Sequence, residues 1–218
     1  MIRFNWLKPF LAAAMMSAAF GVFAQGNDVV PMNPPQPTEN DGKIEVLEFF
    51  SYACPHCATL DPSLETWAKR QPVDVKFKRV PVDGINGFNG AAALFYALEA
   101  MGQLDRLHTK IFDAFHVEHV ILANPATLNK WLEKNGVDPK KFEEVLKSFS
   151  VSTKVQRARK MNLDYKIESV PTLVVNGRFK VAQTSGPERL LGFVDQLIGQ
   201  ARAASTPAAA VKAAVPKK

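Results

Sequence analysis

The sequence KIEVLEFFSYACPHC, residues 43–57, decides the fold of this chain. Residues 43–50 are nearly all apolar or β-favouring, which is typical of a strand buried in the centre of a sheet. Ser51 to Cys54 then turns the chain, and Pro55 suits the first turn of a helix. The stretch therefore predicts a buried strand, a short turn and a helix over 56–70, with two cysteines where the turn meets the helix.

The segments that follow alternate between strand and helix patterns. Residues 73–80 predict a second strand, and residues 83–148 read as all-helical. The pair Asn176-Gly177 between two apolar runs is the strongest short-range signal for a β-hairpin. We expect helices over 91–101, 104–115, 125–135, 138–149, 152–163 and 187–203, and strands over 171–175 and 179–181. This order predicts an α/β protein: a thioredoxin fold (43–83 and 151–203) with an inserted all-helical domain (84–150).

The two ends of the chain differ from the body in composition. Residues 1–24 contain Arg3 and Lys8 followed by the apolar run 9–23, which predicts a secretory signal cleaved after Ala24. A retained membrane anchor is the alternative, but the run of about 15 residues is shorter than the roughly 20 that span a bilayer. Residues 25–42 form a proline-rich lead-in that we expect to be extended and weakly ordered, and the Ala/Pro/Lys tail 204–218 predicts disorder.

The net charge of +6 does not indicate a nucleic-acid-binding protein. Five of the positive charges lie in the two terminal segments, which contain no acidic residue. The body between them is nearly neutral, so it lacks the electrostatic footprint that polyanions require. We therefore expect no nucleic-acid partner.

Cys54 and Cys57 are the only cysteines. This count excludes a disulfide framework, a four-cysteine zinc site and an iron–sulfur cluster. Half a zinc site would need a second ligand pair, and nothing in the sequence connects His108, His116 or His119 to Cys54, although the last two could share a helix face. A structural disulfide that closes a two-residue loop would stabilise little. A redox-active dithiol is the remaining interpretation of this cysteine pair.

The position of the two cysteines predicts that they differ in reactivity. Cys54 lies at the helix start, where unpaired amide groups and the helix dipole favour a thiolate. His56 adds positive charge if it is protonated, or else it is a bystander on the helix surface. Cys57, one turn further in, is expected to stay a buried thiol. A stabilised thiolate at Cys54 favours the reduced form, so the disulfide form is a strong oxidant.

Residues 48–57, EFFSYACPHC, together with Val170-Pro171-Thr172 on a later strand, resemble the DsbA family of periplasmic thiol:disulfide oxidoreductases. The resemblance spans roughly residues 43–203. It implies that Cys54 is the exposed nucleophile and Cys57 the buried resolving cysteine, with Pro55 and His56 between them. It also implies that Pro171 is a cis-proline that faces the disulfide and, after Val170, helps to bind extended substrate. An ordinary trans proline at a strand start is the alternative.

Glu48 is an acid within a strand that otherwise reads as buried. Burial raises the pKa of a carboxyl unless a cation pairs with it, and Lys78 or Arg79 on the next strand could do so. The strand register that would choose between them cannot be fixed from the sequence. The resemblance implies that Glu48 helps to move the proton of the buried cysteine; the alternative is a carboxylate at a solvated strand end.

These observations predict a periplasmic dithiol oxidase that introduces disulfide bonds into secreted proteins with free thiols. The resemblance implies reoxidation by a quinone-linked membrane partner of the DsbB type, and we expect a monomer with no metal or organic cofactor. A disulfide isomerase or reductase is one alternative, but the roughly 18 residues of the lead-in are too few for the dimerisation domain such proteins usually carry. A non-catalytic peptide binder is the other. Residues 84–90, which vary in the family, leave the substrate range open.

Overall fold

The computed structural model describes residues 28–39, 41–182 and 186–205 and is built around a mixed sheet of five strands. The strands are β1 (Val29–Pro31), β2 (Ile44–Phe50), β3 (Val75–Pro81), β4 (Thr172–Val175) and β5 (Phe179–Ala182). Their order across the sheet is β1-β5-β4-β2-β3; β2 and β3 are parallel, and the other neighbours are antiparallel. Among the described residues, no helix is long and apolar enough to cross a membrane.

Helices cover both faces of the sheet because the central strands are apolar on both sides. On one face, Val46 of β2 packs with residues of α1 (Pro55–Lys69) and α7 (Pro187–Ser205). On the other face, Leu47 and Phe49 pack with Ala158 of α6 (Phe149–Asp164). All seven residues of β2 are buried, as a central strand requires.

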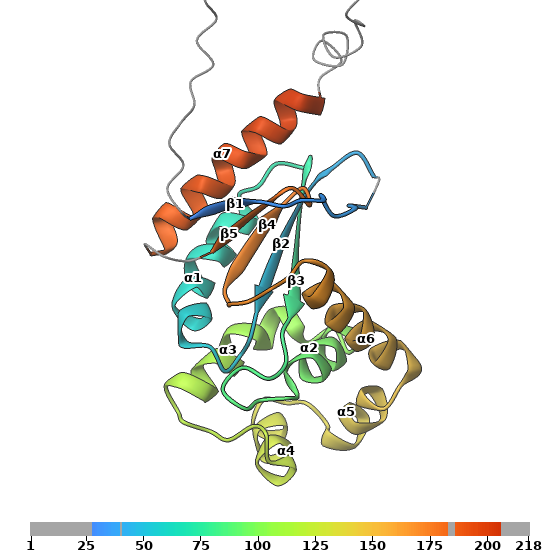
Figure 1. Cartoon of the computed structure of the whole chain (residues 1–218). Coiled ribbons are helices and arrows are strands. Elements are labelled where there is room, and N and C mark those ends of the chain that lie inside the picture. The colour runs from blue at the N-terminus through green and yellow to red at the C-terminus, as the bar shows by residue number, and fades with distance from the viewer. Residues whose placement is uncertain (1–27, 40, 183–185, 206–218) are drawn as a thin grey trace, which may run out of the picture.

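The remaining helices gather at the end of the sheet where β2 and β3 end (Figure 1). They are α2 (Ala91–Ala100), α3 (Leu104–His116), α4 (Pro125–Lys134) and α5 (Pro139–Leu146). Asn124 and Asp138 cap α4 and α5 with their side chains, and a proline follows each cap. This region lies between β3 and β4 in the chain, so the predicted thioredoxin fold with a helical insertion is confirmed. The exact domain limits stay a prediction.

The proline-rich lead-in contains a strand that the sequence did not predict. Val29–Pro31 forms β1 at the edge of the sheet, where a proline is tolerated because one side of the strand needs no partners. The predicted hairpin turn holds the lead-in in place: Asn176 and Gly177 adopt φ values of 50° and 62°. A Cβ on Gly177 would lie 2.1 Å from the backbone oxygen of Gln36, so only glycine allows this approach.

The two largest differences from the expected element boundaries lie at the junction of α5 and α6. α5 ends at Leu146, and α6 begins at Phe149 instead of residue 152. The reason is Ser148, whose hydroxyl accepts a hydrogen bond from Val151 N and caps α6. Ala204 and Ser205, the first two residues of the tail predicted to be disordered, are instead the last two residues of α7, because the helix continues past residue 203. The predicted signal 1–24 and residues 206–218 of the tail lie outside the described residues.

Candidate active site

Cys54 is the N-cap of α1, at the point where β2 delivers the chain to the helix. Its backbone has φ −94° and ψ 116°, and its amide donates to Ser51 O at 3.1 Å. The sulfur accepts a hydrogen bond from the backbone N–H of Cys57 at 3.4 Å. The sulfur therefore takes the place of the side-chain oxygen that usually caps a helix, and it meets the amide groups that favour a thiolate.

Cys54 is more covered than expected for an exposed nucleophile. Its exposed fraction is 5%, against 0% for Cys57. The Cys54 thiol donates a hydrogen bond to Val170 O at 3.3 Å, so the segment before Pro171 lies over it. The Val170–Pro171 peptide bond is cis, as the resemblance implies, and Pro55 and His56 are exposed beside the pair. The prediction that Cys54 is exposed was therefore wrong, although Cys54 is more exposed than Cys57, as predicted.

The two thiols have opposite pKa shifts. The hydrogen bond from the Cys57 thiol is the largest cause that lowers the pKa of Cys54, to about 6 from an ordinary 9.0; burial opposes it, and the backbone N–H groups of Cys57 and His56 and the charge of His56 add to it. Burial raises the pKa of Cys57, as do its hydrogen bond to Cys54 and the nearby charges of Cys54 and Glu48. A thiolate in the reduced pair therefore belongs on Cys54.

Glu48 lies in the middle of β2 with an exposed fraction of 1%, which contradicts the alternative of a solvated strand end. The register answers the open question about its partner: Glu48 lies opposite Arg79, and Arg79 Nε is 3.0 Å from Glu48 Oε2. Burial outweighs this cation and raises the pKa of Glu48 to about 7. The carboxyl can therefore hold or release a proton near neutral pH.

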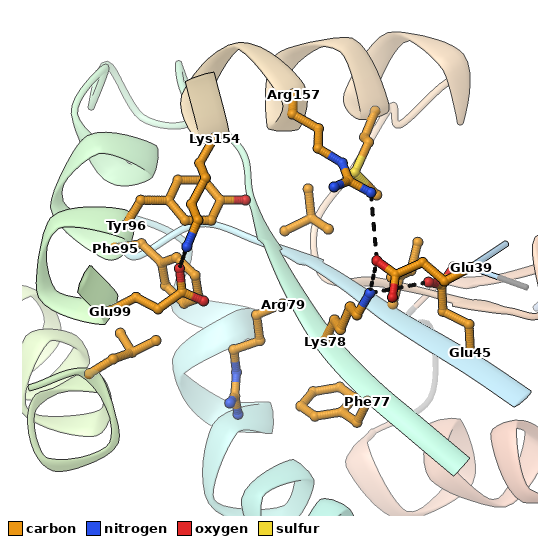
Figure 2. A pocket seen from close by; sticks show the side chains of 14 residues that line it. Glu39, Glu45, Phe77, Lys78, Arg79, Phe95, Tyr96, Glu99, Lys154 and Arg157 are labelled. Atoms are coloured by element: carbon orange, nitrogen blue, oxygen red, sulfur yellow. Dashed lines mark hydrogen bonds and ion pairs between the residues drawn. The ribbon is translucent and has the colours of Figure 1, made fainter. Parts of the chain in front are cut away.

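Lys78 points to the opposite side of β3 from Arg79. It forms ion pairs with Glu39 and, at 3.6 Å, with Glu45. Both cations line a pocket of 470 Å³ beside β3, and Figure 2 shows Lys78 turned toward the two glutamates while Arg79 is directed away from them. Successive residues of a strand face opposite sides, so only one of the two could meet Glu48.

Sequence reasoning missed the other partners of Arg79. Its guanidinium lies 3.3 Å from Asp61 Oδ1 and 3.0 Å from Glu65 Oε1, both on α1. Asp61 is buried and follows Cys57 by one helical turn. An acid on the helix face that also carries Leu60 and Leu64 was the available signal for this cluster.

A groove runs from the active-site loop over the helical region. It has a volume of about 510 Å³, and Asn86 and Phe88 of the variable segment 84–90 help to line it, as expected for a segment that shapes the surface near the site. Asn86 Nδ2 donates to Ala53 O at 2.7 Å and ties the two loops together. His116 and His119 also line the groove, but α3 ends at His116 and His119 has φ 53°, so they do not share a helix face.

The chain matches the model of the DSBA-like thioredoxin domain over residues 45–197. It is 37% identical to the thiol:disulfide interchange protein DsbA of Pseudomonas aeruginosa over 89% of this chain and 96% of the relative, and 42% identical to DsbA of Bordetella parapertussis over 88% and 95%. The crystal structure of P. aeruginosa DsbA matches with a TM-score of 0.76, at 37% identity over 82% of this chain and 94% of that chain. The DsbA structure from Xylella fastidiosa matches with a TM-score of 0.74, at 35% identity over 81% and 96%. With Cys54 and Cys57 at the start of α1 and Val170-Pro171 beside them, this chain belongs to the DsbA family.

Proposed function

We propose that this chain oxidises thiol pairs of secreted proteins by exchange at the Cys54 sulfur. Membership of the DsbA family makes the chain a thiol:disulfide oxidoreductase. The difference in pKa between Cys54 and Cys57 supports the direction of the exchange. A stabilised Cys54 thiolate favours the reduced protein, and therefore makes the disulfide form an oxidant.

The proposed exchange proceeds in two displacements. A substrate thiolate attacks the Cys54 sulfur of the oxidised protein; the bond between the sulfurs of Cys54 and Cys57 breaks, and Cys57 leaves with the electron pair. A second substrate thiolate then attacks the substrate sulfur of the mixed disulfide, and Cys54 leaves as a thiolate. The substrate loses two electrons and gains a disulfide, and the protein gains the two electrons as its reduced pair.

Glu48 is the proposed proton carrier for Cys57. When Cys57 leaves during the first displacement, its raised pKa requires that it take up a proton. Glu48 is buried close enough for its charge to raise that pKa, and its own pKa of about 7 lets it donate the proton and later take it back.

Val170 and Pro171 form the proposed binding segment for the substrate chain. The Val170 carbonyl already accepts from the Cys54 thiol, so a substrate bonded to Cys54 would lie against this segment. Pro55 and His56 are exposed next to Cys54 and complete the proposed rim of the site. An extended peptide with a cysteine at its centre fits this arrangement.

The proposed location is the periplasm, reached by the predicted signal over residues 1–24. The relatives of this chain are DsbA proteins, so substrate proteins with free thiols are its expected partners. We further propose a membrane oxidase of the DsbB type as the acceptor of electrons from reduced Cys54 and Cys57, and a monomeric state. These three assignments rest on the family and on the sequence of the N-terminal segment.

Single-turnover oxidation of a reduced, unfolded protein with several cysteines tests the proposal. The oxidised chain should form disulfides in that protein in stoichiometric amounts, while Cys54→Ser should not. A non-catalytic peptide binder would leave the substrate thiols unchanged. An isomerase would rescue a scrambled disulfide protein faster than it oxidises the reduced one, and that result would reverse the assigned direction.

A further inference from the structure

His108 of α3 is a buried histidine that joins the helical region to the active site. Its Nδ1 lies 2.8 Å from the hydroxyl of Tyr52, two residues before Cys54. Its Nε2 lies 3.3 Å from Oδ1 of Asp61 on α1. The ring packs among aromatic side chains, including Phe50 and Phe112. One side chain therefore contacts the catalytic loop and the carboxylate cluster at once.

The surroundings define which nitrogen carries the proton. Burial lowers the pKa of His108, so the ring is neutral. A bare Nε2 lone pair would face the Asp61 carboxylate, which is unfavourable, so we place the proton on Nε2 and let the Tyr52 hydroxyl donate to Nδ1. The N–H is off the ideal axis for a hydrogen bond, and the described residues offer Nε2 no aligned acceptor, so its interaction with Asp61 is mainly electrostatic.

Asp61 transmits this contact to Arg79. Its Oδ2 accepts from the Thr109 hydroxyl at 2.8 Å, and its Oδ1 is shared between His108 and Arg79. Burial would raise the pKa of Asp61, but His108, Thr109 and Arg79 outweigh it and lower the pKa, so Asp61 stays a carboxylate. Arg79 is thus one cation divided among three carboxylates, those of Glu48, Asp61 and Glu65.

We propose that His108 is a positioning residue for the dithiol exchange. Its Nε2–H attracts the Asp61 carboxylate and so weakens the attraction between Asp61 and the Arg79 guanidinium. Arg79 then interacts more strongly with Glu48, and His108 in this way sets the proton affinity of Glu48. This inference rests on the proposed role of Glu48 as proton carrier. It also gives the helical insertion a part in the chemistry, since α3 supplies the side chain that balances charges on α1 and β3.

The sign of the effect follows from the groups that face Glu48. These are Arg79 from β3, Cys57, Asp61 and Glu65 from α1, and Tyr52 from the loop. In His108→Leu, Asp61 loses the electrostatic attraction of the Nε2–H but keeps Thr109 and Arg79, so it draws Arg79 toward itself. Glu48 then has a weaker cation, and its titration midpoint should rise by about 0.5 to 1 pH unit. His108→Gln can still present an N–H to Asp61 and should keep the midpoint close to that of the parent.

Carbon-13 NMR titration of the Glu48 side-chain carboxyl in the reduced full chain measures this midpoint directly. Asp61→Asn should lower it, because the negative charge that opposes ionisation of Glu48 is lost. Adding His108→Leu to Asp61→Asn should then have no further effect. Phe112→Leu is the packing control: it removes contacts with the same ring and should lower the melting temperature without moving the midpoint.

Three results of the NMR titration would overturn the inference. They are an unmoved midpoint in His108→Leu, an equal shift in His108→Gln, and a full His108→Leu shift in the Asp61→Asn background. If His108→Leu does not fold, His108→Met, which also offers Asp61 no N–H, takes its place in both backgrounds. The pH profile of mixed-disulfide formation, the step in which Cys57 takes up its proton, is measured beside the NMR titration and should move with the midpoint. If the midpoint moves and the rate profile does not, Glu48 is not the proton carrier, and the proposed effect of His108 on the exchange is overturned with it.

Discussion

Replacing His56 by Gln separates the charge of this residue from the other causes that lower the pKa of Cys54. His56 is exposed, and its charge contributes less than the Cys57 thiol or the backbone N–H groups of Cys57 and His56. The substitution leaves those groups in place. The pKa of Cys54 should therefore rise but stay much nearer to 6 than to 9.

The size of the expected rise in the pKa of Cys54 follows from the order of the contributions that lower this pKa. Together they lower the pKa from 9.0 to about 6 against the opposing effect of burial. As the smallest of four favourable contributions, the charge of His56 accounts for about one pH unit or less, which is about 1.4 kcal/mol and, for a two-electron couple, about 30 mV. A one-unit rise lowers the thiolate fraction at pH 6 from about a half to about a tenth, so alkylation of Cys54 should slow about fivefold there and change little at pH 8.

Ultraviolet titration of the Cys54 thiolate, alkylation rates across pH and equilibrium with glutathione measure these quantities in the same proteins. The disulfide of the Gln variant should be less oxidising, since the reduced state loses the stabilisation. His56→Lys keeps a positive charge and is the matched control, with a pKa close to that of the parent. A rise of more than about two units in His56→Gln would refute the order of causes, and an unchanged pKa and potential would make His56 a bystander.

Three further predictions concern the other site residues. Cys54→Ser should abolish oxidation of substrate thiols, whereas Cys57→Ser should accumulate thiol-sensitive adducts on non-reducing gels; adducts in the Cys54 variant alone would reverse the two roles. Glu48→Gln should raise the melting temperature more at pH 8 than at pH 5. In the folded protein the pKa of Glu48 is about 7, above its ordinary value of 4.5, so the stability that Glu48 contributes is complete below pH 4.5 and is lost as the pH rises through 7. This loss lowers the free energy of unfolding of the parent protein by about 3 kcal/mol, and the Gln variant does not undergo it. An equal gain at both pH values would mean that Glu48 is not the group that titrates. Pro171→Ala restores an N–H next to the carbonyl that covers Cys54, and it should prolong mixed disulfides in the Cys57→Ser background while leaving the melting temperature within a few degrees; unchanged lifetimes would remove Pro171 from substrate release.

The catalytic strand and helix could be predicted because their signals are local. An apolar run, a turn and a proline at a helix start lie within 15 residues, and the structure places β2 and α1 there. The partner of Glu48 could not be predicted, because Lys78 and Arg79 lie next to each other and a shift of one residue in register exchanges their sides. The register became evident only from the pairing of β2 with β3.

β1 and the His108 contacts were missed for different physical reasons. An edge strand of three residues that ends in proline carries little strand signal, and it forms because β5 offers an open edge. His108 lies on the same helix as Ile111 and Phe112, and helical spacing indicates a core position without naming what it meets. Its two polar partners come from the catalytic loop and from α1, far away in the sequence, and only the packing of α3 against α1 brings them together.

The helical insertion is part of the active site and not an appendage to it. Two histidines of α3 hold Tyr52 from both sides: His108 contacts its hydroxyl and His116 Nε2 lies 2.8 Å from its carbonyl oxygen. Phe50 and Tyr52 belong to the hydrophobic core of the helical region, although they lie in the strand and loop that present Cys54. The loop that sets the position of the reactive sulfur is therefore packed by the insertion as much as by the sheet. Removing the insertion would expose Phe50 and Tyr52 and take both histidines from the loop, so the thioredoxin-like part alone should not keep the geometry that separates the pKa values of Cys54 and Cys57.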